Sequence, residues 1–253
     1  MFSQYRDEHL SRIETQWSIL FRSTPNATSS VNAAQAALLQ RYCGAVYRYL
    51  LAVVGNVHEA DELAQEFALR MLQGTFKTAD PSKGRFRDYV KASLFNLVRR
   101  YHRKKNQGPA LLPEDAPEPA APESVEEDRA FAEKWREELL AKVWEDLSKH
   151  EKETGQPFHT FMLYRTQNAK TSSSAMAEHF GKLTGKPLTA AGVRQTLHRA
   201  RERFGELLIE EVARSLQTKD KEAVEQELAD LGLLTYCQDA VDKWKAGKRS
   251  TPT

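Results

Sequence analysis

Residues 38–72, LLQRYCGAVYRYLLAVVGNVHEADELAQEFALRML, set the fold, and residues 84–105, GRFRDYVKASLFNLVRRYHRKK, extend it. Spacing of three to four predicts an amphipathic helix ending at Gly55, with the apolar stripe Leu38, Leu39, Tyr42, Val46, Tyr49, Leu50 and Val53. Asn56 and Glu59 predict a capping box for a second helix, whose stripe is Ala60, Leu63, Ala64, Phe67 and Met71. A third helix is predicted to turn its apolar residues toward the core, namely Phe86, Val90, Leu94, Leu97 and Tyr101. Its cations are then left to solvent or a partner, namely Arg87, Lys91, Arg99, Arg100 and Arg103.

Composition predicts an all-α protein that stays in the cytoplasm. The chain has 253 residues, 40% hydrophobic and 28% charged, with 12 glycines and no Val/Ile/Thr-rich alternating runs. No run approaches the roughly 20 apolar residues of a membrane span, and the N-terminus has no secretory signal. The two cysteines, Cys43 and Cys237, are too few for a disulfide framework or a four-cysteine zinc site.

Charge is strongly segregated along the chain, although the net charge is only +2. Residues 83–105 carry nine cations and one acid, which indicates a polyanion-binding helix. Residues 106–128 carry seven acids, no cations and five prolines, so we expect an extended, mobile linker there. The linker predicts two helical domains.

The part after the linker predicts a helix-turn-helix. Ser124 and Glu127 predict a capping box before the stripe Phe131, Trp135, Leu139, Val143 and Leu147. Two helices joined by a turn follow within residues 172–212, the second opened by a Thr189 cap. Its outward face presents polar groups able to bond base edges, namely Gln195, His198, Arg199 and Glu202, with Arg194 and Arg201 at the edge. Helices are also expected at residues 1–24 and as a pair at 220–246.

Catalytic and metal-binding motifs are missing from the sequence. The seven histidines form no HExxH or Cys/His cluster, there is no GxSxG, and GKLTGKP lacks phosphate-loop spacing. We therefore expect a protein that is not an enzyme and holds no metal or cofactor.

Two blocks in the expected order resemble bacterial sigma factors. Residues 38–72 and 84–105 resemble the domain that binds core RNA polymerase and melts promoters, and AMAEHF to GVRQTLHRARERF resembles the C-terminal helix-turn-helix. The layout is similar to the extracytoplasmic-function (ECF) subfamily, in a longer variant with terminal extensions. The resemblance implies an N-terminal helical extension over 1–30, a polymerase-binding and minus-10-melting domain (sigma domain 2) over 31–107, a flexible acidic Pro-rich linker over 108–123, a helix-turn-helix minus-35-binding domain (sigma domain 4) over 124–216, and a C-terminal helical extension over 217–253.

The resemblance also implies roles for individual residues. The residues implied to dock on the polymerase β′ clamp are Asp61, Glu62, Gln65, Glu66 and Arg70. The loop at 75–84 falls where the family captures a flipped minus-10 base. The residues implied to bind minus-10 DNA are Lys83, Arg85, Arg87, Lys91, Asn96, Arg99, Arg100, His102, Arg103 and Lys104. The candidate groups for stacking on bases are Phe86, Tyr89, Phe95, Tyr101 and His102. The residues implied to recognise the minus-35 element are Thr189, Arg194, Gln195, Thr196, His198 and Arg199.

The implied partners are core RNA polymerase, through its β′ clamp and β flap, and promoter DNA, which would place the chain at the nucleoid. The turn GKLTGKPLT is longer than the compact family turn. An anti-sigma factor or a kinase stays open as a further partner, as do the promoter sequence and the inducing signal. Two alternatives remain: a helix-turn-helix regulator acting without core polymerase, and a sigma-like polymerase antagonist.

Overall fold

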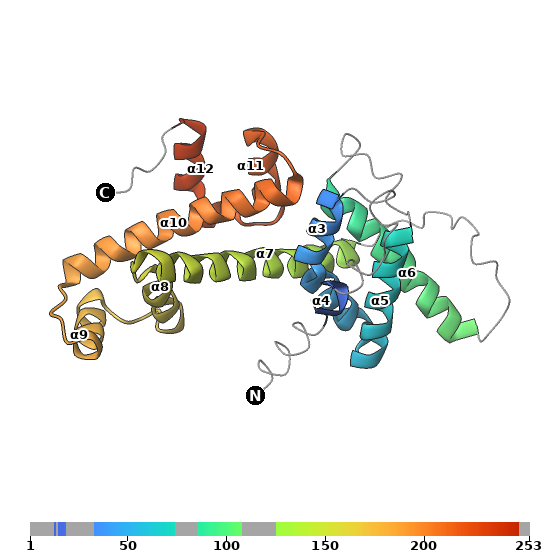
Figure 1. The fold of residues 1–253 in the computed structure, drawn as a ribbon, viewed down its shortest axis with the longest axis horizontal. Coiled ribbons are helices and arrows are strands. Elements are labelled where there is room, and N and C mark those ends of the chain that lie inside the picture. The colour runs from blue at the N-terminus through green and yellow to red at the C-terminus, as the bar shows by residue number, and fades with distance from the viewer. Residues whose placement is uncertain (1–12, 14, 19–32, 74–84, 108–124, 248–253) are drawn as a thin grey trace. The chain divides into compact units, whose positions relative to one another are not determined.

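A computed structural model describes residues 13, 15–18, 33–73, 85–107 and 125–247 (Figure 1). The predicted all-α class is confirmed, because these residues form helices and connecting turns with no strand among them. The chain divides into two compact units, residues 1–138 and 139–253. The predicted linker at 108–123, the loop at 75–84 and the Ser124 cap lie outside the described residues.

The first unit contains α3 (Ala33–Arg41), α4 (Cys43–Val54), α5 (Val57–Gln73), α6 (Phe86–Gln107) and the beginning of α7 (Val125–Thr154). The single helix predicted up to Gly55 is divided at Tyr42 into α3 and α4. Gly55 ends α4 as expected, in the left-handed region at φ 70° that glycine adopts without a Cβ clash. The predicted apolar stripe is buried from Leu38 to Leu50, whereas Val53 is only half-buried.

The predicted start of α5 is confirmed. Asn56 Oδ1 accepts hydrogen bonds from the backbone N–H groups of His58 (2.9 Å) and Glu59 (3.2 Å). The predicted stripe of α5 is fully buried: Ala60, Leu63, Ala64, Phe67 and Met71. Burying this stripe turns the opposite, polar face of α5 outward.

An aromatic cluster joins α4, α6 and the start of α7. Tyr49 packs on Phe95 and on Phe131, with ring centroids 5.6 Å apart in both pairs. Tyr42 packs on Trp135 at 4.8 Å, and Phe131 on Trp135 at 5.8 Å. All five rings are at most 2% exposed. The start of α7 therefore contributes to the core of the first unit.

A buried ion pair reinforces this packing. Arg48 on α4 pairs with Glu138 on α7, whose side chain is only 3% exposed. A Cβ added at Gly44 would overlap the carboxylate of Glu138, so the glycine lets this side chain lie close against α4. The second domain was predicted to start at residue 124, whereas in the structure residues 125–138 belong to the first unit. The periodicity of α7 identified its buried face but not the surface covering it.

The N-terminal segment also contributes to this core. Ile13 is fully buried, and Trp17 is 1% exposed and stacks on Phe67 of α5 at 6.1 Å. Residue 13 and residues 15–18 are helical, in agreement with the predicted helix; the rest of residues 1–24 lies outside the described part. Ile13 and Trp17 of the predicted extension are therefore part of the core of the first unit.

The second unit contains the remainder of α7, α8 (Phe158–Gln167), α9 (Ser173–Thr184) and α10 (Ala190–Leu216). Its core includes Phe161, Met176, Phe180, Val193 and Leu197. Side-chain caps open α9 and α10: Ser172 Oγ accepts from Ala175 N–H (3.1 Å) and Thr189 Oγ1 from Gly192 N–H (3.0 Å). Gly185, at φ 67°, ends α9, so residues 185–189 connect the two helices.

The predicted C-terminal helix pair is confirmed as α11 (Lys221–Asp230) and α12 (Gln238–Lys245), separated by the short helix η2 (Leu234–Tyr236). These elements pack on α10. A Cβ at Gly205 would lie 2.8 Å from the Ala240 side chain, so glycine permits α12 to approach α10 closely. Among the described residues, no helix is long and apolar enough to cross a membrane.

Candidate polymerase and nucleic-acid interface

The five residues predicted to dock on polymerase lie together on α5. Glu62 and Gln65 are exposed, while Asp61, Glu66 and Arg70 are half-buried. Arg70 pairs with Glu66 at 2.5 Å, one helical turn away. The face is polar and mainly acidic, which suits a partner with exposed cations.

Leu69 was missed in the sequence analysis. Its side chain is 44% exposed on the same face of α5, one turn from Gln65. The available signal was its position outside the apolar stripe of Ala60 to Met71. An exposed leucine beside polar groups would add an apolar contact to charge pairing if this face met a partner.

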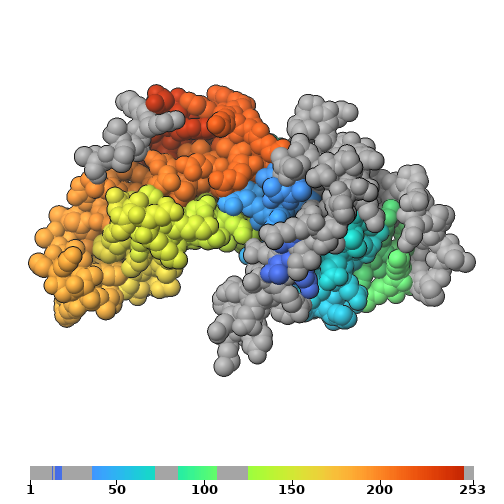
Figure 2. Space-filling model, in the orientation of Figure 1, coloured from blue at the N-terminus to red at the C-terminus, as the bar shows by residue number. Residues whose placement is uncertain are grey.

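The C-terminal half of α6 carries the exposed part of the predicted DNA surface. His102, Arg103 and Lys104 are exposed and Arg100 is half-buried. Arg100, Arg103 and Lys104 recur at helical spacing and so share one face. Figure 2 shows α5 (cyan) beside the later part of α6 (green) on one surface. Lys83 lies outside the described residues.

Lys105 links the end of α6 to the start of α5. Its Nζ is 2.9 Å from Tyr101 Oη and 3.0 Å from Glu59 Oε1. Hydrogen bonding to Tyr101, and then to Glu59, raises the pKa of Lys105. The pKa of Glu59 is lowered by its hydrogen bonds to Tyr101 and Lys105. These contacts hold the basic end of α6 beside the capped end of α5.

The N-terminal half of α6 is less accessible than the sequence predicts. The side chains of Arg87 and Lys91 are only 12% and 19% exposed. Lys91 Nζ forms an ion pair with Asp128 Oδ1 of α7 at 2.9 Å and lies 5.9 Å from the Phe95 ring. These two cations are therefore less exposed than the end of α6, because α7 packs beside this part of the helix. Asn96 is exposed, and Arg85 and Arg99 are half-buried.

The structure separates the candidate stacking groups. Phe95 is 2% exposed and belongs to the aromatic cluster, so of its two expected roles, core residue or stacking group, the structure places it in the core. Phe86 is half-buried, 6.2 Å from Trp135, and burial raises the pKa of Tyr89. The Tyr101 hydroxyl is bonded to Lys105, and His102 is the exposed ring of the set.

The outward face of α10 presents Arg194, Gln195, His198 and Arg199, all exposed. The two predicted threonines bond to their own helix: Thr189 caps it, and Thr196 Oγ1 donates to the Gly192 carbonyl at 3.0 Å. The structure therefore gives these hydroxyls a local role in α10.

A contact from α12 to this face was also missed. Glu202 pairs with Lys243 of α12 and lies 3.6 Å from His198 Nε2. The hydrogen bond from Lys243 is the main cause that lowers the pKa of Glu202; Coulombic attraction to Lys243, His198 and Arg199 acts in the same direction. Lys243 is 41 residues away from Glu202, and neither helix's period indicates the pairing.

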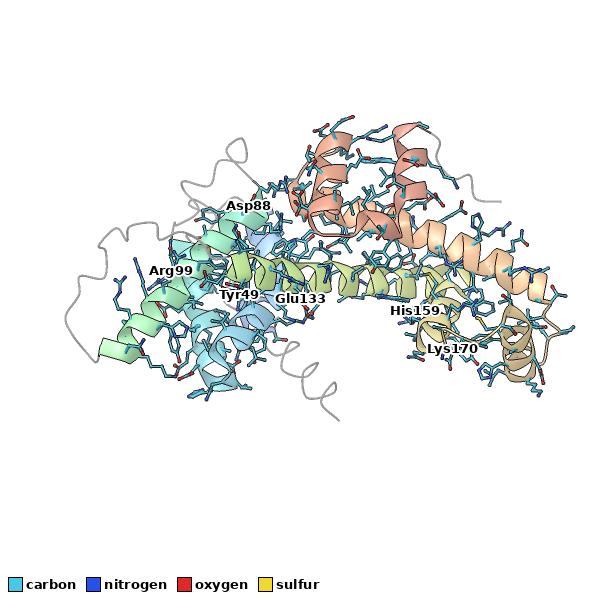
Figure 3. All side chains as sticks on the ribbon, turned by 180° about the vertical axis from the view of Figure 1, so that it is seen from behind. Tyr49, Asp88, Arg99, Glu133, His159 and Lys170 are labelled. Atoms are coloured by element: carbon cyan, nitrogen blue, oxygen red, sulfur yellow. The ribbon has the colours of Figure 1, made fainter. Side chains whose placement is uncertain are left out.

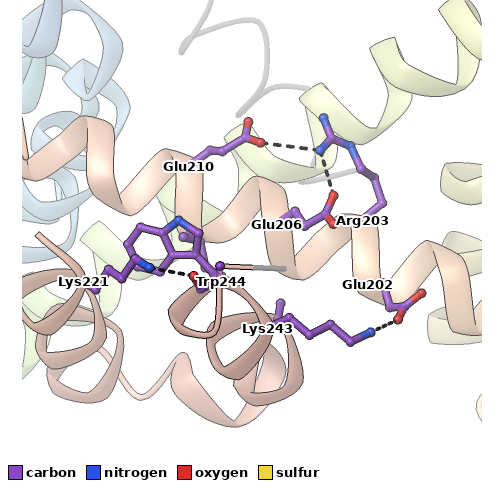
Figure 4. A pocket seen from close by; sticks show the side chains of 10 residues that line it. Glu202, Arg203, Glu206, Glu210, Lys221, Lys243 and Trp244 are labelled. Atoms are coloured by element: carbon purple, nitrogen blue, oxygen red, sulfur yellow. Dashed lines mark hydrogen bonds and ion pairs between the residues drawn. The ribbon is translucent and has the colours of Figure 1, made fainter. Parts of the chain in front are cut away.

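A cavity of about 560 Å³ lies between α10 and the helices α11 and α12 (Figure 4). Arg203 pairs with Glu206 (3.0 Å) and Glu210 (3.5 Å), while Lys221 donates to the Trp244 carbonyl (2.8 Å). The charged groups of its wall are thus engaged with one another. Among the described residues, no three His, Cys, Asp or Glu side chains gather as metal ligands. Burial raises the pKa of Cys237 to about 12, so this thiol stays protonated.

Comparison with known proteins identifies one part of the chain. Residues 38–107 match the family model of Sigma-70 region 2. No curated protein and no solved structure matches the chain. The matched residues run from the end of α3 through α4, α5 and α6, and so include both the polar face of α5 and the basic helix α6. The match supports a sigma-70 family factor.

Proposed function

We propose that this chain is an RNA polymerase sigma factor of the ECF type that directs core polymerase to specific promoters and melts the minus-10 element. The observation that carries the proposal is the region 2 match, which covers α5 and α6 together. Sigma region 2 implies binding to both core polymerase and promoter DNA. Catalysis would belong to the polymerase.

In this proposal, α5 and α6 have different partners. The exposed Glu62, Gln65 and Leu69 of α5 would contact the β′ clamp, where acids and an apolar side chain can both find partners. The face of Arg100, Arg103 and Lys104 on α6 would follow DNA phosphates near the melted strand. Unstacking one base costs a few kcal/mol, so binding energy suffices for melting without ATP.

The second unit would supply promoter recognition. The exposed Arg194, Gln195, His198 and Arg199 of α10 would enter the major groove of the minus-35 element. Arginine can form paired hydrogen bonds with guanine, and glutamine with adenine. Caps from Ser172 and Thr189 fix the starts of α9 and α10, which is the rigidity that a recognition helix needs.

Permanganate footprinting of unpaired thymines tests this proposal. Core polymerase with the purified chain should give reactive minus-10 thymines on its own promoter, while core alone or the chain alone should not. Binding to core without reactive thymines would indicate the polymerase antagonist. Tight duplex binding in the absence of core, with no melting in its presence, would indicate the independent regulator.

A further inference from the structure

The start of α7 packs beside α6, the helix proposed to bind DNA. Phe131 and Trp135 anchor α7 in the aromatic cluster, and Glu138 pairs with Arg48. The turn before Phe131 is much less enclosed, because Val125 is 82% exposed and Glu126 is exposed. This first turn carries three consecutive acids, Glu126, Glu127 and Asp128.

One of these acids contacts a cation of α6. Asp128 Oδ1 lies 2.9 Å from Lys91 Nζ, and the Lys91 side chain is only 19% exposed. Tyr49 lies near Arg99, beside the start of α7 (Figure 3). Burial is the main cause that raises the pKa of Tyr49; the charges of Glu127 and Asp128 raise it further and that of Arg99 lowers it.

Acids in a first turn also stabilise their own helix through its dipole. That effect does not require a particular neighbour. The Asp128–Lys91 pair, by contrast, connects α7 with a helix that would bind DNA phosphates, and it uses one of the cations needed for that binding.

We propose that the first turn of α7 is an acidic latch on α6, in which Asp128 occupies Lys91 until the phosphates of single-stranded DNA displace it. The inference rests on the proposed function of α6. A partly exposed ion pair is weak, and four backbone N–H groups at a helix start have no partner within the helix, so the turn can open while Phe131 stays in the core. The latch would weaken binding to DNA of any sequence.

The test compares Asp128→Asn with Glu133→Gln, which removes the same charge from an exposed position on the same helix. Fluorescence anisotropy of the full chain with a labelled 20-nucleotide single strand at low salt measures binding. Asp128→Asn should tighten binding about 1.5- to 5-fold, the range expected for one surface ion pair. Its binding should also depend more steeply on salt, by roughly 0.7 in log–log slope, because one more phosphate contact forms. Glu133→Gln should match wild type.

Equal effects of the two variants, no effect of Asp128→Asn, or no binding to the strand would overturn the proposal. Lys91→Gln is a second variant that tests which cation is released. In that background Asp128→Asn should no longer tighten binding to the single strand. Binding that still tightens would show that Lys91 is not the cation released. Hydrogen exchange at residues 129–132 should become faster when the strand binds, and unchanged protection would count against opening of the turn.

This assay contains no polymerase, whereas permanganate footprinting depends on it. Failure of the latch with normal promoter melting would leave the sigma-factor proposal intact. A functional latch in a chain that melts no promoter would leave a regulated polyanion-binding helix without the initiation role.

Discussion

Removing Arg48 should destabilise the first unit strongly, because it removes the guanidinium that pairs with a buried carboxylate. Glu138 is 3% exposed at its side chain and Arg48 is 18% exposed. Breaking a buried ion pair on one side costs about 3–5 kcal/mol, and the partial exposure of Arg48 places Arg48→Met at about 3 kcal/mol. Replacing both residues by methionine should return the free energy of unfolding to within about 1 kcal/mol of wild type, because matched apolar groups replace such pairs with little loss. The expected coupling is therefore about 2–4 kcal/mol.

Urea unfolding followed by tryptophan fluorescence measures this cycle. Two of the four tryptophans, Trp17 and Trp135, lie in the first unit, and Trp144 and Trp244 lie in the second. A Trp144→Phe/Trp244→Phe background thus reports on the first unit alone, which avoids a mixed transition of two units. If Arg48→Met and Glu138→Met each lowered the free energy of unfolding by less than about 0.5 kcal/mol, and these losses simply added in the double variant, the inference that Glu138 anchors α7 in this core would be refuted.

Three predictions concern function. Reversing charge on the exposed face of α6 should abolish promoter opening and leave core binding intact, and normal permanganate reactivity would contradict it; the residues to change to Glu are Arg100, Arg103 and Lys104. Gln65→Ala/Glu66→Ala should weaken competition with another sigma factor for core, so unchanged competition would remove α5 from the interface. Arg199→Ala should cost about 1–3 kcal/mol of discrimination between promoters that differ at one minus-35 base. A uniform loss on all promoters would instead assign Arg199 to phosphate.

Local patterns predicted the helices and several of their ends. The stripe of α5 and the caps at Asn56 and Thr189 depend only on neighbours within a turn or two, so the sequence contains the whole signal. Gly55 is similar, because its left-handed backbone is a local property.

Contacts between distant segments could not be predicted in this way. The stripe of Phe131 and Trp135 is equally compatible with either unit, and only the folded chain shows it against Tyr42 and Tyr49. Gly44 carried a signal, a glycine within an apolar helix, but nothing in the sequence identifies Glu138 as the group it admits.

The candidate site shows the same division. Periodicity correctly placed Gln65, Arg103 and Arg199 on exposed or solvent-facing surfaces. It gave no indication of the ion pair between Lys91 and Asp128, because that contact depends on whether α7 packs beside α6. The exposed helix faces were therefore predictable, and the part of α6 covered by α7 was not.

Run-off transcription with purified core polymerase and a library of genomic promoter fragments tests the central claim most directly. Adding the chain should give transcripts from a restricted set of promoters that share a minus-10 and a minus-35 sequence. No transcript from any fragment, although the chain is folded and core is active with another sigma factor, would contradict the account.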